Sequence, residues 1–206
     1  SGQLSDARVS YERAIALQPG YVQALNNLGT VLDDLGEHTG AEIQFRAAID
    51  AAPTAPEPWA GLAGNLRVQG RSAEARTAFE QALALRPEFP AVRWNLAVLD
   101  LAEGKFADGW TNFLFRPSVD RAQAPLADLP HDLRGIAIEI VDEQGLGDAL
   151  FFLRFVSELR LRGATVRYEM DTRLTGIVAR MMDFGEPTAG ARVIRAALGD
   201  LPYLMG

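Results

Sequence analysis

VQALNNLGTVLDDLGEHTGAEIQFRAAIDAAPTA, residues 22–55, is followed directly by PEPWAGLAGNLRVQGRSAEARTAFEQALALRPEF, residues 56–89. The two segments have equal length, and an alanine, a phenylalanine, a glycine and a proline each fall at matching positions in both. The same spacing of 34 residues continues on both sides in these columns: Ala7, Ala41 and Ala75; Tyr11, Phe45, Phe79 and Phe113; Pro19, Pro53 and Pro87; Leu28, Leu62 and Leu96; Gly36, Gly70 and Gly104. Independent columns that share one period identify an internal repeat.

Each repeat predicts two helices joined by a turn. Leu25, Leu28 and Leu32 form an apolar stripe at helical spacing, and residues 41–48 form the equivalent stripe of a second helix. The glycine column suits the left-handed position that ends a first helix. The proline column ends each second helix, because proline cannot continue the hydrogen-bond ladder. One further column stays small, so that neighbouring helices can approach: Gly29, Ala63 and Ala97. The sequence therefore predicts stacked helical hairpins.

This pattern resembles the tetratricopeptide repeat (TPR). Residues 22–55 and 56–89 match full repeats, and residues 2–19 match the second helix of a preceding one. Residues 90–115 match a following repeat whose second half departs from the pattern. Because the sequence starts within a repeat, we expect further repeats upstream in the parent protein. The resemblance implies an α-solenoid over residues 1–116, with first helices that line a groove for an extended peptide.

Asparagines stand out on these first helices. Asn27 and Asn95 occupy the same repeat position, two periods apart. In sugar-transferring TPR proteins this column often holds asparagines that clamp a peptide backbone, and a primary amide can both donate and accept hydrogen bonds. The alternative is that the two are solvated or serve helix packing. The full set predicted to line the groove is Asn26, Asn27, Asn65, Trp94 and Asn95.

Basic and aromatic residues refine this prediction. Arg67 and Arg93 are the only basic candidates on the first helices, and they occupy different repeat positions. This argues against a clamp for a C-terminal carboxylate. Trp59 falls in a column that is aromatic in the TPR consensus, and the resemblance therefore predicts that it packs in the core. Trp94, one residue away from that column, is the better surface candidate.

The character of the chain changes after Arg116. Prolines punctuate a polar linker, residues 117–134. Alternating strands and helices are then predicted over residues 135–141, 149–161, 164–170, 174–182 and 192–194. This alternation predicts a parallel sheet, a partial Rossmann-like α/β unit over residues 135–206. Such a piece leaves unpaired sheet edges, through which the chain could associate with itself.

The turn after the first predicted strand carries Gly145 and Gly147 but has Leu150 where a dinucleotide fingerprint needs a third glycine. Asp148, at the start of the next helix, would repel a pyrophosphate. Binding of a nicotinamide or flavin is therefore not expected. A nucleotide-binding regulator that uses residues 145–148 is kept as a third functional hypothesis.

This second part resembles the start of a heptosyltransferase-related glycosyltransferase domain. The resemblance rests on Glu143-Gln-Gly-Leu-Gly-Asp148, on the phenylalanine-rich helix that follows, and on residues 161–166. Gly109-Trp110 and residues 113–116 partly match the junction that links TPR repeats to such domains. The resemblance implies a GT-B fold whose second lobe binds a nucleotide-sugar donor. It makes Asp148 a general base toward the acceptor, with Gln144, Gly145 and Gly147 in the acceptor or anion loop; the alternative role of Asp148 is a helix N-cap.

Composition excludes several classes of function. The 206 residues include no cysteine and two histidines, so we expect no metal site, and no cofactor apart from the nucleotide sugar of a full-length parent. The net charge of −7 argues against nucleic acid as a partner. The apolar runs are too short for membrane insertion, and we expect a cytoplasmic protein.

The main functional hypothesis is a protein- or peptide-binding TPR module joined to an incomplete glycosyltransferase-like domain. Two lobes of that type need about 300 residues, so we expect no catalysis by this chain alone, with a parent that is a TPR-guided glycosyltransferase. The alternative is a non-enzymatic TPR scaffold or adaptor.

Overall fold

A computed structural model describes residues 2–117, 129–141, 152–168 and 190–205. The chain divides into two compact units, Ser1–Leu99 and Asp100–Gly206, and the boundary falls within a helix. We call them unit 1 and unit 2 and describe each by itself. None of the described helices combines the length and the apolar character needed to cross a bilayer.

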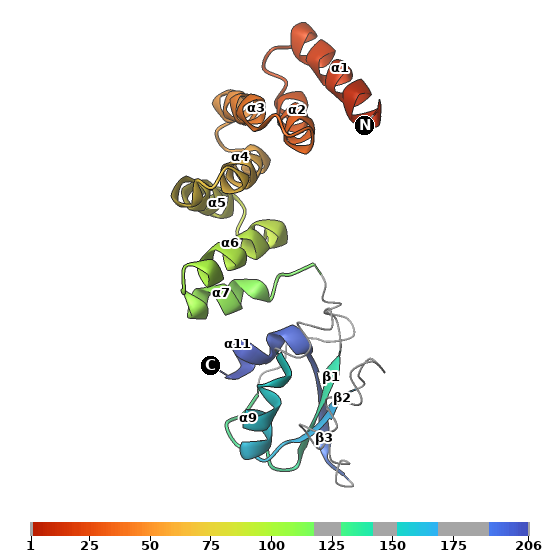
Figure 1. The fold of residues 1–206 in the computed structure, drawn as a ribbon, viewed down its shortest axis with the longest axis vertical. Coiled ribbons are helices and arrows are strands. Elements are labelled where there is room, and N and C mark those ends of the chain that lie inside the picture. The colour runs from red at the N-terminus through yellow and green to blue at the C-terminus, as the bar shows by residue number, and fades with distance from the viewer. Residues whose placement is uncertain (1, 118–128, 142–151, 169–189, 206) are drawn as a thin grey trace. The chain divides into compact units, whose positions relative to one another are not determined.

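Unit 1 is a row of paired antiparallel helices (Figure 1). Its elements are α1 (Gly2–Leu17), α2 (Val22–Asp34), α3 (His38–Ala51), α4 (Pro56–Val68), α5 (Ser72–Leu85) and the greater part of α6 (Pro90–Ala102). Each predicted repeat is one hairpin, α2 with α3 and α4 with α5. The predicted solenoid is confirmed.

The turns within the hairpins follow from the glycine column. Gly36, Gly70 and Gly104 have φ angles of 79°, 78° and 75°, as predicted for residues that end a first helix. After α2, the amide of Glu37 donates to the carbonyl of Leu32 at 2.8 Å, which closes the turn. A side chain at such a φ would be strained, so glycine recurs there.

The core of unit 1 is built from the repeat columns. Phe45 and Phe79 are each 1% exposed and lie between consecutive hairpins. The small column is needed for this packing, because a Cβ on Gly29 would lie 2.7 Å from the Phe45 ring. Gly61 approaches the same ring even more closely. The backbones of α2 and α4 thus lie against one aromatic side chain.

Unit 2 contains the predicted parallel sheet. The central strand β1 (Ile136–Val141) pairs in parallel with β2 (Thr165–Tyr168) and with β3 (Arg192–Ala197). The third strand runs three residues beyond the predicted end at residue 194. The described helical elements beside the sheet are α9 (Val156–Leu161), η1 (Leu198–Asp200) and α11 (Leu201–Met205). The predicted helix over 174–182 lies outside the described residues.

The last helix that follows the repeat pattern, α7 (Phe106–Phe113), belongs to unit 2. It has 8 residues, whereas α3 and α5 have 14 each. Trp110 and Phe113 pack against Phe152, with ring centroids 6.1 and 6.0 Å away. Phe113 is the fourth member of the aromatic column, and it contributes to the α/β core.

Candidate functional site

A pocket of about 330 Å³ lies between α2 and α4 in unit 1. We call it the α2–α4 pocket. It brings together Asn26 and Asn27, two of the predicted groove residues. Its volume lies within the usual range for binding pockets. Its lining residues are Val22, Gln23, Asn26, Asn27, Ala55, Glu57 and Pro58.

The Asn26 side chain has an unused acceptor. Its Oδ1 is buried, and no donor of the described residues reaches it. A buried acceptor without a partner is unfavourable by about 1–3 kcal/mol. The neighbouring Asn27 is exposed, and its Nδ2 donates only a long bond, of 3.4 Å, to Tyr11 Oη. Together these amides can accept from and donate to a bound backbone.

The one carboxylate in the pocket is already engaged. Glu57 accepts a hydrogen bond from Arg86, which holds the pKa of Glu57 below its usual value although burial opposes the shift. Pro56 and Pro58 lie in the first turn of α4, where proline is well tolerated, and they place Glu57 at the rim. The remaining polar side chains of the pocket are amides, which suit an uncharged peptide backbone.

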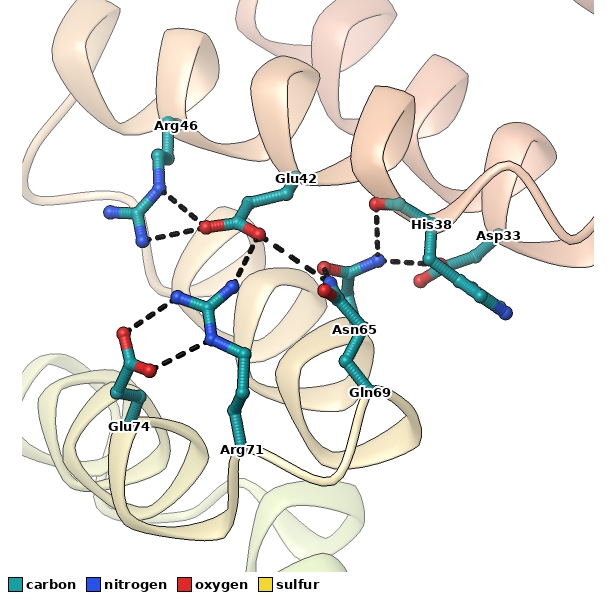
Figure 2. Close-up of polar contacts among 8 residues, drawn as sticks. All are labelled: Asp33, His38, Glu42, Arg46, Asn65, Gln69, Arg71 and Glu74. Carbon is teal, nitrogen blue, oxygen red and sulfur yellow. Dashed lines mark hydrogen bonds and ion pairs between the residues drawn. The ribbon is translucent and has the colours of Figure 1, made fainter.

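Asn65 lies elsewhere and has a different role (Figure 2). It is fully buried, and its Nδ2 donates to Asp33 Oδ1 at 2.6 Å and to the carbonyl of His38 at 2.9 Å. Its Oδ1 accepts from Gln69 at 2.7 Å. Because both amide hydrogens are used within the protein, Asn65 cannot bind a peptide in the predicted way. The structure removes it from the groove set.

Glu42 continues this network toward α5 (Figure 2). It accepts hydrogen bonds from Arg46 at 2.8 Å and from Arg71 at 2.7 Å, and Arg71 also binds Glu74. Burial raises the pKa of Glu42, but the hydrogen bonds from Arg46, Arg71 and Gln69 together outweigh it, so the pKa lies below its usual value. The network joins the two full repeats, and the sequence prediction missed it.

Trp94 and Asn95 lie on α6, outside the α2–α4 pocket. Both are partly buried, and Asn95 Nδ2 donates to the carbonyl of Ala91, one turn earlier, at 2.8 Å. Asn95 therefore differs from Asn27 in bonding although it shares its repeat position. Trp59 packs against the core of unit 1 and donates to the carbonyl of Pro53 at 3.0 Å, which confirms its predicted packing role.

The predicted sugar-transfer loop is not among the described residues. Gln144, Gly145, Gly147 and Asp148 all fall in the stretch 142–151. Their roles remain predictions.

A second pocket, of about 450 Å³, lies in unit 2. The sequence analysis did not anticipate it, although aromatic residues on α7 were a signal for it. No charged side chain lines it, so it offers apolar contact with little polar recognition. Its lining residues are Phe106, Ala107, Trp110, Thr111, Phe155, Pro202 and Tyr203.

Family comparison decides the nature of the helical hairpins. Two models described as "Tetratricopeptide repeat" match residues 1–56 and residues 66–109. The chain contains TPR repeats. The recurring glycine, proline and aromatic columns are therefore those of TPR hairpins, and unit 1 is a TPR solenoid.

The chain is similar to parts of several longer proteins, and one of them is named for the same repeat. Human tetratricopeptide repeat protein 7B is 37% identical over 95 residues, which is 46% of this chain and 11% of that protein. Protein FlbA of Caulobacter vibrioides is 28% identical over 165 residues, 75% of this chain and 28% of FlbA. The peroxisomal targeting signal receptor of Kluyveromyces lactis is 34% identical over 70 residues, 34% of this chain and 12% of the receptor. The chain thus spans a small part of each relative.

A solved structure shows the same fold. The crystal structure of MamA superimposes with a TM-score of 0.50 at 18% identity, over 55% of this chain and 67% of MamA. At that identity the likeness concerns the solenoid fold alone.

Proposed function

We propose that this chain is a protein-interaction module, and that its TPR solenoid holds an extended segment of a partner protein in the α2–α4 pocket. The observation that carries the proposal is the buried Oδ1 of Asn26, to which no described residue donates a hydrogen bond. A peptide N–H would supply that donor, and Asn27 beside it can bond the adjacent peptide carbonyl. A relative that is 34% identical over 70 residues is named as a peroxisomal targeting signal receptor, which is consistent with peptide recognition.

The experiment selects binders from a displayed library of random 12-residue peptides and measures a selected peptide by fluorescence anisotropy. Asn26→Ala and Asn27→Ala should each weaken binding about 2- to 10-fold, because each removes a hydrogen bond worth about 0.5–1.5 kcal/mol. Gln81→Ala is the matched control, since Gln81 is an exposed amide on a second helix. Equal affinities for all of these variants would refute the α2–α4 pocket as the binding site.

We also propose that unit 2 is the start of a glycosyltransferase-like domain. What supports it is the order β2-β1-β3 of three parallel strands, with β1 in the centre. The FlbA match also extends over three quarters of the chain, which is more than the repeats occupy. We expect this chain alone to release no nucleotide from nucleotide sugars. Donor turnover by the purified chain would contradict that expectation, whereas the adaptor alternative requires only peptide binding.

A further inference from the structure

The side chain of one arginine on the first helices has no partner among the residues that the structure describes. Arg67 lies in the last turn of α4 and is partly buried, and its side chain makes no hydrogen bond or ion pair with any of the described residues. Its Nε is buried and lacks an acceptor. The other basic residue on these helices differs, because Arg93 Nε donates to the carbonyl of Pro87 at 3.2 Å.

A structural role accounts for only part of this arrangement. A cation in the last turn of a helix interacts favourably with the helix dipole. That interaction needs a charge near the helix end, and a solvated guanidinium would provide it. It does not explain why an N–H is withdrawn from water without an acceptor, which is unfavourable. A carboxylate from outside the chain would satisfy this donor and the charge together.

The path from the α2–α4 pocket to Arg67 is lined by small residues. The less buried face of α4 runs from Glu57, which lines the pocket, through Ala60 and Gly64 to Arg67. A Cβ placed on Gly64 would meet no atom within 4 Å, so the surface is open there. Ten residues of helix separate Glu57 from Arg67, about 15 Å along the axis. An extended peptide covers that distance with about four or five residues.

We infer that the partner segment is acidic: an aspartate or glutamate side chain binds Arg67, about four or five residues from the part of the segment that passes Glu57 in the α2–α4 pocket. This inference rests on the proposed function and specifies the chemistry of its ligand. Asn26 offers an acceptor that needs a donor, and Arg67 offers a donor that needs an acceptor. The two residues lie on the first helices of consecutive repeats. Arg67 binds a single side-chain carboxylate, so the segment need not end in a C-terminal carboxylate.

The test uses the same library of 12-residue peptides on the intact chain and on Arg67→Gln. The peptides selected by the wild-type chain should be enriched in Asp and Glu, and Arg67→Gln should lose that enrichment. A selected acidic peptide should bind Arg67→Gln about 10-fold more weakly. Its counterpart with Asn or Gln at the acidic position should bind both proteins equally. Arg13→Gln is the matched control, because Arg13 is exposed on α1.

The outcomes separate the two proposals. If Asn26→Ala weakens binding but Arg67→Gln does not, the acidic ligand is refuted while peptide binding stands. Selection of neutral or basic peptides by the wild-type chain would refute it as well. If Asn26→Ala and Arg67→Gln both bind like wild type, or if labelled oligouridine binds through Arg67 while peptides do not, the proposed function fails and this inference with it. Circular dichroism of each variant confirms that the solenoid remains folded.

Discussion

Arg116 Nη1 donates a hydrogen bond of 2.8 Å to Asp200 Oδ1, across 84 positions of sequence. The two side chains are 0% and 1% exposed. The Arg116 guanidinium also lies 4.9 Å from the centroid of the Phe113 ring. A buried ion pair therefore fixes the end of the α7 segment to the turn that follows β3. Arg116 is the residue after which the character of the sequence changes.

Loss of one partner of this pair should destabilise unit 2 strongly. Asp200→Asn removes the negative charge that the buried Arg116 guanidinium binds, and breaking a buried pair in this way costs about 3–5 kcal/mol. Urea unfolding followed by tryptophan fluorescence measures the effect, because Trp110 packs in this core.

An exposed pair provides the control for that measurement. Asp132→Asn removes an ion pair with Arg134. The side chain of Asp132 is 54% exposed and that of Arg134 is 82% exposed, so this variant should change the free energy of unfolding little. The double variant Arg116→Met with Asp200→Leu should be more stable than either single charge removal. Similar losses for Asp200→Asn and Asp132→Asn would argue against a buried pair.

Alanine substitutions at two glycines of α4 should change the stability of unit 1 in opposite directions. A Cβ on Gly61 would overlap the Phe45 ring, and overpacking of this kind costs about 1–3 kcal/mol. Gly64 faces open space, so Gly64→Ala should stabilise the helix by about 0.5–1 kcal/mol. Thermal unfolding by circular dichroism compares them. Phe45→Leu should recover part of the loss in Gly61→Ala, and equal effects of the two glycine changes would contradict the packing described.

Alanine variants of Asn65 and Asn27 should have opposite effects on stability and on peptide affinity. Asn65→Ala removes the two hydrogen bonds that Nδ2 donates to the His38 carbonyl and to the Asp33 carboxylate, and it removes the nearer acceptor of the Gln69 amide, which should cost about 1–3 kcal/mol in unfolding free energy. It should leave the affinity for a selected peptide unchanged. Asn27→Ala should show the converse, full stability with weaker binding. A loss of affinity without loss of stability in Asn65→Ala would return Asn65 to the groove.

The depressed pKa of Glu42 predicts a stability that falls in acid. Since the pKa is lower in the folded chain than its ordinary value of 4.5, the stabilisation is complete above about pH 4.5 and is lost as pH falls through the folded pKa. Glu42→Gln should be less stable at pH 7 and should lose less stability between about pH 5 and pH 3. Melting temperatures across this range test it. Glu80→Gln, at an exposed carboxylate, should follow the wild-type curve.

The helical hairpins could be predicted because their causes are local. A glycine at a left-handed turn and a proline after a helix act within a few residues, so Gly36, Gly70 and Pro53 each mark a boundary that the structure confirms. The three strands were also recognisable, because β-branched runs are short and continuous. The sequence grouped Asn65 with Asn26 and Asn27, but the structure shows that the Asn65 amide bonds to Asp33 and His38, because helical spacing alone does not reveal which amide meets a partner from another helix. The peptide-binding role of Asn26 and Asn27 remains a prediction.

The sequence by itself therefore determined the helical repeat, its turns and the parallel strands. Each of these features depends on residues that are close together in the sequence. Only the tertiary structure decided where equivalent residues go. Phe45 and Phe79 pack between repeats, whereas Phe113 of the same column packs with the sheet. Likewise Asn65 is satisfied and Asn26 is not. The physical reason is that burial and hydrogen-bond satisfaction depend on neighbours distant in sequence, which a 34-residue period does not encode.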